Sequence, residues 1–343
     1  MKYLNTILFS LIIILLIVTV FQSTGLPYYD TYPEILVDSS DTTTTIAAIE
    51  FPFKDDIVQG EVTLFLAPYN GTKHEDANKA RLFGNFDEDG WKEKYYLAIT
   101  EDPAQDQMYF ALLGFFDEYA AEHNLTPDEY AELLTTYVQD IPYKTTGMTA
   151  KFPIETVVED WGDCDDKSVL LAGLLSKKGY DAGLMYFPED NHMTAAIKGG
   201  EETGYGNTGY TLIETTRYAY IGEEPALILN QTTGKFVLYM VGEGTISYTA
   251  SYQVGTILDT REQAYAEVEA LYDEMSALSV EIENQEISLK QSWSMPGYLA
   301  YKENLKVYNA GVAARNEYIE LINMINSRSY NREEIYQTVI SMR

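Results

Sequence analysis

The residue with the clearest chemical potential in this chain is its only cysteine, Cys164. It follows Gly162 and Asp163, and an apolar pattern with helical spacing begins shortly after it at Val169. A thiol at a helix N-terminus lies in the field of the helix dipole and beside unpaired backbone N–H groups, which favour the thiolate form. Because the thiolate is the nucleophile, this position suits a catalytic cysteine. The alternative is a buried cysteine that packs as a small apolar side chain.

A cysteine nucleophile needs a base, and the base needs a group that orients it. His192 begins a predicted strand over residues 192–198, and Glu214 lies near the end of a predicted strand over residues 210–215. If these strands are neighbours, the two side chains lie side by side, and a helix packed across the sheet would point Cys164 toward them. Each also has an ordinary interpretation, as a hydrogen-bonded strand histidine and as a solvated carboxylate.

The surrounding sequence predicts an α+β core. From Gln105 apolar residues recur at helical spacing, and Thr126, Pro127 and Glu129 form the start signal of a second helix. The cysteine-bearing helix is expected to end at Gly179. Strands are predicted over residues 60–68, 182–187, 192–198, 210–215, 235–241 and 245–252.

Four stretches of the chain together form a recognisable pattern, namely residues 137–143, 162–168, 191–193 and 210–216. With them, the region from residue 105 to residue 225 resembles the transglutaminase-like superfamily, particularly its prokaryotic cysteine-peptidase-like members. The resemblance implies a papain-like fold, in which the cysteine-bearing helix packs on an antiparallel sheet.

The resemblance also implies a catalytic triad, with Cys164 as nucleophile, His192 as base and Glu214 as the orienting residue. The family more usually has Asp at the third position, and Glu can still accept the imidazole N–H bond. The backbone N–H of Cys164 is one expected oxyanion donor. By analogy with papain-like enzymes Gln139 is a candidate for the second, and the indole N–H of Trp161 is an alternative.

Acidic residues surround the cysteine. Asp163 suits the N-cap of the helix, and Asp165 and Asp166 suit its first turn, where carboxylates oppose the positive end of the dipole. The alternative is a calcium site built from Asp160 and these three residues, although their spacing does not match an EF-hand loop. Neighbouring negative charge disfavours a thiolate, so the Asp side chains would have to point away from the sulfur.

The composition excludes several classes of function. The formal net charge is −30, from 53 acidic and 23 basic residues, which argues against nucleic acid or an anionic bilayer as the main partner. One cysteine allows no disulfide within the chain, and three scattered histidines make a structural zinc site improbable. The sequence therefore predicts neither a cofactor nor a metal.

The chain is expected to have several parts. Lys2 precedes an apolar run over residues 7–21, which indicates an uncleaved, single-pass signal anchor with the bulk of the chain extracellular, or a cleaved signal peptide and a secreted protein. The expected parts are this membrane segment over residues 1–24, a mixed strand and loop region over 25–104, the transglutaminase-like core over 105–259 and a helical hairpin over 260–343.

The hairpin prediction rests on a seven-residue spacing of apolar residues, such as Val268 and Met275, on both sides of a break at residues 293–297. Such a coiled-coil-like hairpin would pack on the core, associate with a second copy of the chain, or act as a stalk.

Two functions remain open at this point. The first is a surface-displayed thiol hydrolase or acyltransferase, which acts on an amide bond of a peptide, protein or cell-wall substrate through a thioester. The second is a non-catalytic binding or assembly module with the same fold.

Overall fold

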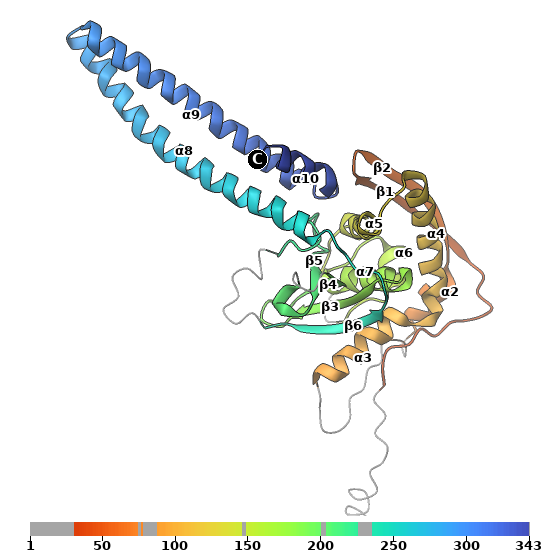
Figure 1. Cartoon of the computed structure of the whole chain (residues 1–343). Helices are drawn as coiled ribbons and strands as arrows, with labels where there is room; N and C mark the ends of the chain where they lie inside the picture. Colours follow the sequence, from red (N-terminus) through yellow and green to blue (C-terminus); the bar gives the residue numbers. More distant parts are fainter. Residues whose placement is uncertain are drawn as a thin grey trace, which may run out of the picture.

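The chain folds into a body of mixed helices and strands, from which a long helical hairpin projects (Figure 1). Within the described residues no helix is long and apolar enough to cross a membrane. The predicted membrane segment, residues 1–24, lies outside the described residues. This computed structural model describes residues 31–74, 77, 88–145, 149–199, 204–225 and 235–342.

The centre of the body is a four-stranded antiparallel sheet with the strand order β5-β4-β3-β6. Strand β4 is buried along almost its whole length, and it pairs with β5 so that Ala195 lies opposite Ile213. These four strands confirm four of the sequence predictions. Their bounds are β3 (Asp181–Phe187), β4 (His192–Lys198), β5 (Tyr210–Ile213) and β6 (Val237–Glu243).

Helix α7 (Cys164–Lys178) packs against β3, β4 and β6. It begins at Cys164 because Asp163 and Asp166 form a reciprocal capping box, in which each side chain bonds the backbone of the other residue. It ends at Gly179, whose φ of 100° is the left-handed conformation that a glycine adopts readily. Both predicted ends of this helix are confirmed.

The other helices of the body cover the sheet and a second, two-stranded sheet. The predicted start of α5 is confirmed, because Thr126 and Glu129 form a capping box with Pro127 at the first helical position. The elements are β1 (Thr44–Phe53), β2 (Asp56–Phe65), α2 (Leu66–Thr72), α3 (Glu88–Glu101), η1 (Pro103–Gln105), α4 (Asp106–His123), α5 (Pro127–Asp140), α6 (Pro153–Glu159) and η2 (Tyr205–Asn207).

One continuous hydrophobic core joins these elements, with buried side chains from Ile35 to Ala250. The β1-β2 hairpin packs on α4 and α5, and α3 packs on α7 and β6. The expected boundary between residues 104 and 105 therefore does not correspond to a break in packing. Strand β1 and helix α3 carried no recognised sequence signal.

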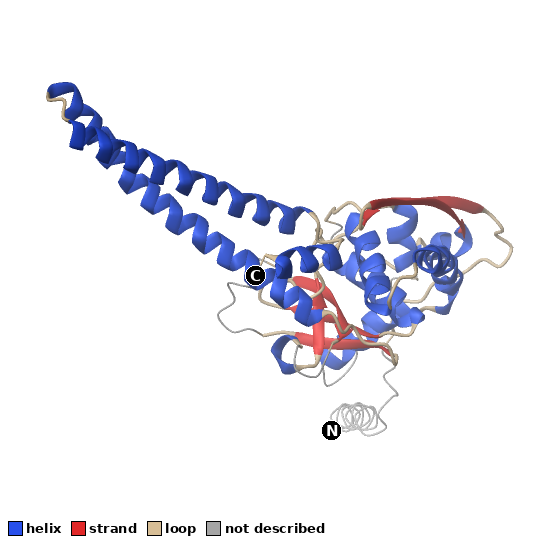
Figure 2. Cartoon of the chain, turned by 45° about the horizontal axis from the view of Figure 1, so that its top comes forward, coloured by secondary structure: helices blue, strands red, loops and turns tan. Residues whose placement is uncertain are grey.

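The projecting hairpin, called the arm below, consists of the antiparallel helices α8 (Ser251–Gln291) and α9 (Met295–Ser327) (Figures 1 and 2). Helix α10 (Arg332–Ser341) packs back on α8 at its root. The predicted hairpin is confirmed, but α8 begins nine residues earlier than the expected boundary at residue 260. The predicted strand over residues 245–252 is wrong, because its last two residues already belong to α8 and only Ile246 makes a bridge pair.

Buried charge connects the arm to the body. Arg332 of α10 forms an ion pair with Glu132 of α5, and both side chains are buried. The hydroxyl of Tyr248 donates a hydrogen bond of 2.7 Å to the same carboxylate. A buried carboxylate is tolerated only when its oxygens are paired in this way, so the root of the arm has a defined position on the body.

Candidate active site

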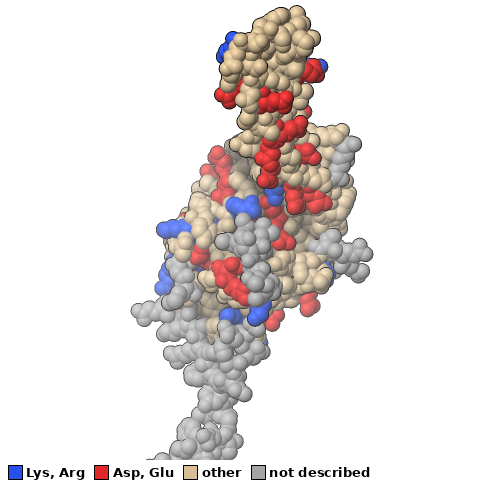
Figure 3. Space-filling view, turned by 90° about the vertical axis from the view of Figure 1, so that its left-hand side faces the viewer, with Lys and Arg blue, Asp and Glu red and all other residues tan. Residues whose placement is uncertain are grey.

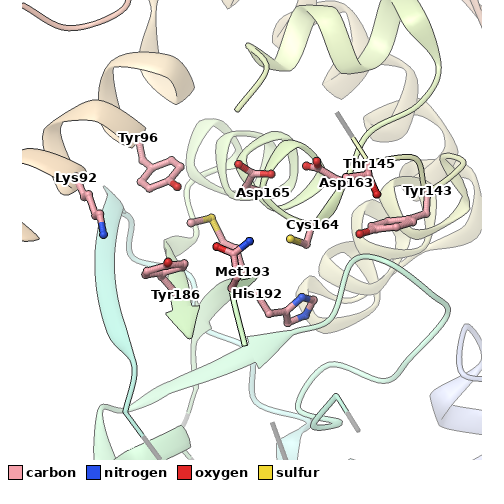
Figure 4. Close-up of a pocket in the computed structure, with 11 residues that line it drawn as sticks. Lys92, Tyr96, Tyr143, Thr145, Asp163, Cys164, Asp165, Tyr186, His192 and Met193 are labelled. Carbon is pink, nitrogen blue, oxygen red and sulfur yellow. The ribbon is translucent and has the colours of Figure 1, made fainter. Parts of the chain in front are cut away.

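Cys164 opens onto a cavity of 460 Å³ at the N-terminus of α7 (Figure 4). Cys164 is partly exposed and lines this cavity, so its side chain is accessible from solvent. As the first residue of α7 it also lies where backbone N–H groups have no partner within the helix. The cavity is lined by Lys92, Tyr96, Tyr143, Thr145, Asp163, Cys164, Asp165, Tyr186, Asn191, His192 and Met193.

His192 and Glu214 form a buried pair beside this thiol. The His192 Nε2 atom lies 3.0 Å from a carboxylate oxygen of Glu214. The pair forms because His192 begins β4 and Glu214 directly follows β5, and these strands are neighbours in the sheet. The other Glu214 oxygen accepts bonds of 2.6 Å from the backbone N–H and the hydroxyl of Thr216. The predicted juxtaposition of the three residues is therefore present.

The electrostatics of the pair favour a charged imidazolium. Burial acts to lower the pKa of His192, but its hydrogen bonds to Cys164 and Glu214 and the attraction of both groups outweigh burial and raise this pKa to about 9. Burial acts to raise the pKa of Glu214, but bonds from His192 and Thr216 lower it to about 2. With Nε2 bonded to the carboxylate, Nδ1 is the ring nitrogen left to face Cys164.

Gln139 is not an oxyanion donor, and this sequence prediction is wrong. Its side-chain amide is buried and donates both hydrogens to backbone carbonyls, at 2.7 Å to Glu214 and 3.0 Å to Ala219. An amide nitrogen has only two hydrogens, so neither remains for a substrate. Gln139 instead fixes the backbone that carries Glu214.

Tyr143 is a site residue that the sequence analysis missed. It lines the cavity, and in Figure 4 its hydroxyl end points toward Cys164. Backbone pairing holds this segment against the cysteine loop, because Lys144 N donates to Gly162 O at 3.0 Å and Gly162 N donates to Pro142 O at 3.2 Å. The position of Tyr143 depends on this contact between distant segments, for which the sequence contains no local signal.

Trp161, the alternative oxyanion donor, lies outside the lining of the cavity. The ammonium groups of Lys144 and Lys151 lie 4.2 Å and 2.9 Å from the centroid of its ring. The ring therefore stabilises two cations through its π face, which is a packing role.

The acidic residues beside the cysteine act mainly on the backbone. Asp163, Asp165 and Asp166 each place an oxygen within 4.8 Å of the others, whereas Asp160 is not part of this group. The two oxygens of Asp166 accept bonds from Lys151 N at 2.7 Å and Asp163 N at 3.1 Å. This is the capping role that the sequence predicts.

Asp165 need not oppose the thiolate. Burial, a hydrogen bond to Asp163 and the neighbouring carboxylates raise the pKa of Asp165 to about 8. The raised pKa favours the protonated carboxyl group, which reduces the negative charge beside the sulfur. This removes part of the expected conflict between the acidic residues and the nucleophile.

A buried lysine stabilises the backbone near the start of α7. Lys167 is fully buried, and its ammonium donates to the carbonyls of Gln139 at 3.1 Å and Ile141 at 2.6 Å. Burial lowers its pKa to about 8, against the attraction of Glu214 and Asp140. Lys167 thereby joins the C-terminal end of α5 to the first turns of α7.

Comparisons of the chain with protein-family models, curated proteins and solved structures found no match. The chemistry of the site therefore has to be inferred from its own geometry. That geometry is a partly exposed cysteine at a helix N-terminus, an imidazole beside it, a buried carboxylate that contacts the imidazole and an open cavity in front.

Proposed function

We propose that this protein is a thiol hydrolase or acyltransferase that acts on an amide bond of a peptide or cell-wall substrate. Cys164 is the nucleophile, His192 the general base and acid, and Glu214 the residue that orients and stabilises the imidazolium. The observation that carries the proposal is the buried contact of 3.0 Å between His192 and Glu214 beside an accessible thiol. Burial of an ion pair has a desolvation cost, and such a pair beside an open cavity is a candidate for a functional site.

The reaction begins with the Cys164 thiolate and the His192 imidazolium. The sulfur attacks the carbonyl carbon, and the backbone N–H of Cys164 and the Tyr143 hydroxyl stabilise the resulting oxyanion. The imidazolium then transfers its proton to the departing amine, so that the C–N bond breaks and a thioester remains. Neutral His192 next takes a proton from water or an acceptor amine, which attacks the thioester and releases the thiolate.

The proposed fold is the transglutaminase-like arrangement that the sequence resembles. It is supported by helix α7, which packs across an antiparallel sheet and presents Cys164 to a histidine and a carboxylate from adjacent strands. With the membrane segment expected over residues 1–24, the proposed location of the enzyme is the outer face of the cell membrane, where it would meet peptide and cell-wall substrates.

The proposal is tested by amide hydrolysis with the full chain and a peptide mixture whose products are identified by mass spectrometry. We expect cleavage by the wild type, and a loss of at least ~10²-fold in rate for His192→Ala because general acid and base catalysis is removed. His123→Ala is a matched control, since His123 is an exposed residue of α4. Added hydroxylamine should trap the acyl group as a hydroxamate, and Cys164→Ala should abolish both products.

The alternative function is a non-catalytic binding or assembly module, and the observation that favours it is the long arm. In that case Cys164→Ala would leave the activity of the protein in its cellular context unchanged, whereas removal of the arm would abolish it. Cleavage that depends on Cys164 would reject this alternative.

A further inference from the structure

The far end of the arm presents apolar side chains to solvent. Residues 287–302, called the arm tip below, include the turn between α8 and α9. Within it Trp293 is 66% exposed, Leu299 61% and Met295 54%. Contiguous exposed apolar residues on a protein surface mark sites of interaction with another molecule. Two further exposed residues of the tip are Ile287 and Tyr298.

The charge of the arm tip differs from that of the adjoining part of α8. Residues 287–302 contain no Asp or Glu and two cations, Lys290 and Lys302. The adjoining part of α8, residues 261–286, contains eight acidic residues and one basic residue. Figure 3 shows this contrast on one face, where acidic side chains follow the arm and the rounded end is largely free of them.

We propose that the arm tip inserts into the interfacial region of a lipid bilayer. Tryptophan and tyrosine rings favour the boundary between head groups and acyl chains, and Leu, Ile and Met side chains favour the hydrocarbon below it. Lys290 and Lys302 flank the residues from Trp293 to Leu299, so their stems can extend along the acyl chains. Lys290 is paired with Glu286 at 2.8 Å but its side chain is 71% exposed, so both ammonium groups can reach lipid phosphates. The tip combines these three features within residues 287–302.

The size of the tip favours a bilayer over a second copy of the chain. A stable interface between proteins buries about 800 Å² on each partner and involves about 20–30 residues a side, which is more than this small turn can supply. Lateral pairing of two arms would also bring the acidic parts of α8 together. Insertion into lipid needs only a few apolar side chains and no complementary surface.

The arm also separates its tip from the acidic body. A helix of 41 residues such as α8 is about 60 Å long at 1.5 Å per residue. Electrostatic repulsion is screened over about 8 Å at physiological ionic strength. Most of the chain's net charge of −30 lies on the body, farther from the tip than this screening length, so it opposes contact between the body and an anionic bilayer more than it opposes insertion of the tip.

The test is quenching of tryptophan fluorescence by brominated phosphatidylcholine vesicles, measured on the full chain. The chain has three tryptophans, Trp91, Trp161 and Trp293, and only the last lies on the arm. The predicted membrane segment contains none, so its own insertion is not detected. We expect quenching in the wild type that is absent from Trp293→Phe. Equal quenching in the two proteins would overturn the proposal.

A second variant tests whether the apolar side chains cause the insertion. The double variant Met295→Asp with Leu299→Asp keeps Trp293 as the reporter. We expect the membrane partition constant, measured by lipid quenching of Trp293, to fall by about tenfold or more for each side chain changed. Val280→Asp is the matched control, because Val280 is 57% exposed on α8 outside the tip. Quenching that survives the double change would overturn the proposal. Trp293 fluorescence that changes with protein concentration in the absence of vesicles would indicate a contact between copies of the chain. That result would overturn the proposal as well.

Discussion

The protonation state of His192 determines when the proposed enzyme is active. Its folded-state pKa is raised from 6.5 to about 9, so the imidazolium that protonates the leaving amine is present below that value. We therefore expect kcat/KM to fall as the pH rises through about 9. Replacement of Glu214 by Gln removes one cause of the raised pKa and should move this alkaline limb to lower pH. The measurement is a pH profile of amide hydrolysis for both proteins.

The same shift has a consequence for folding stability. A histidine with a raised folded-state pKa stabilises the fold fully below its unfolded value of 6.5, and this contribution is lost as the pH rises through about 9. For the kinetic prediction, an alkaline limb of the kcat/KM profile that is identical in the wild type and Glu214→Gln would show that His192 and Glu214 do not interact as described.

Tyr143 is the residue that we expect to stabilise the oxyanion together with the Cys164 backbone. Tyr143→Phe should lower kcat by about 10²-fold with little change in KM, because the hydroxyl acts mainly in the transition state. Tyr143 is 53% exposed, so the midpoint of thermal unfolding should not change. Steady-state kinetics and calorimetry measure the two effects. Tyr252→Phe is the control, and equal kcat values for both variants would exclude Tyr143.

At the scale of elements, the contacts of α5 with the site are structural. Gln139→Leu leaves two buried carbonyls without their donor, so we expect a loss of about 1–3 kcal/mol of unfolding free energy for each carbonyl. Chemical denaturation measures this loss. A variant that keeps its stability and loses only kcat would instead indicate a direct catalytic role. Thr136→Val is the matched control, because its hydroxyl bonds a carbonyl of the same helix.

Elements with strong local signals could be predicted from the sequence. The capping residues of α5 and α7, the left-handed Gly179 and the seven-residue repeat of the arm were sufficient to place these helices. The stretch over residues 245–252 has the composition of a strand, but packing at the root of the arm makes it a connection and the start of α8. Helix α3 has a weak apolar pattern and was not predicted.

The residues of the candidate site also differ in whether the sequence could predict them. Cys164, His192 and Glu214 could be predicted, since each lies at the end of an element with a clear pattern. The roles of Gln139 and Tyr143 could not, because they depend on which backbone groups lie nearby after folding. Lys92 and Tyr96 reach the cavity from α3, a part of the chain in which the sequence contained no motif.

At the scale of the whole molecule, the body and the root of the arm are packed by separate apolar clusters. The body has its own core, and a distinct apolar cluster that includes Tyr220, Ile257 and Ile335 packs the root of the arm. Replacement of residues 276–310 by a short turn should therefore leave amide hydrolysis and the unfolding midpoint of the body unchanged. Kinetics and calorimetry on this variant check the expectation, and a loss of kcat would show that the arm contributes to the active site.

The central claim is that Cys164 and His192 form a reactive pair, and the rate of alkylation by iodoacetamide tests it most directly. Cys164 is the only cysteine, so every alkylated thiol belongs to the site. We expect the wild type to react near neutral pH faster than free cysteine, and His192→Ala to react much more slowly. A thiol that reacts no faster than free cysteine, with a rate unaffected by loss of His192, would contradict the account.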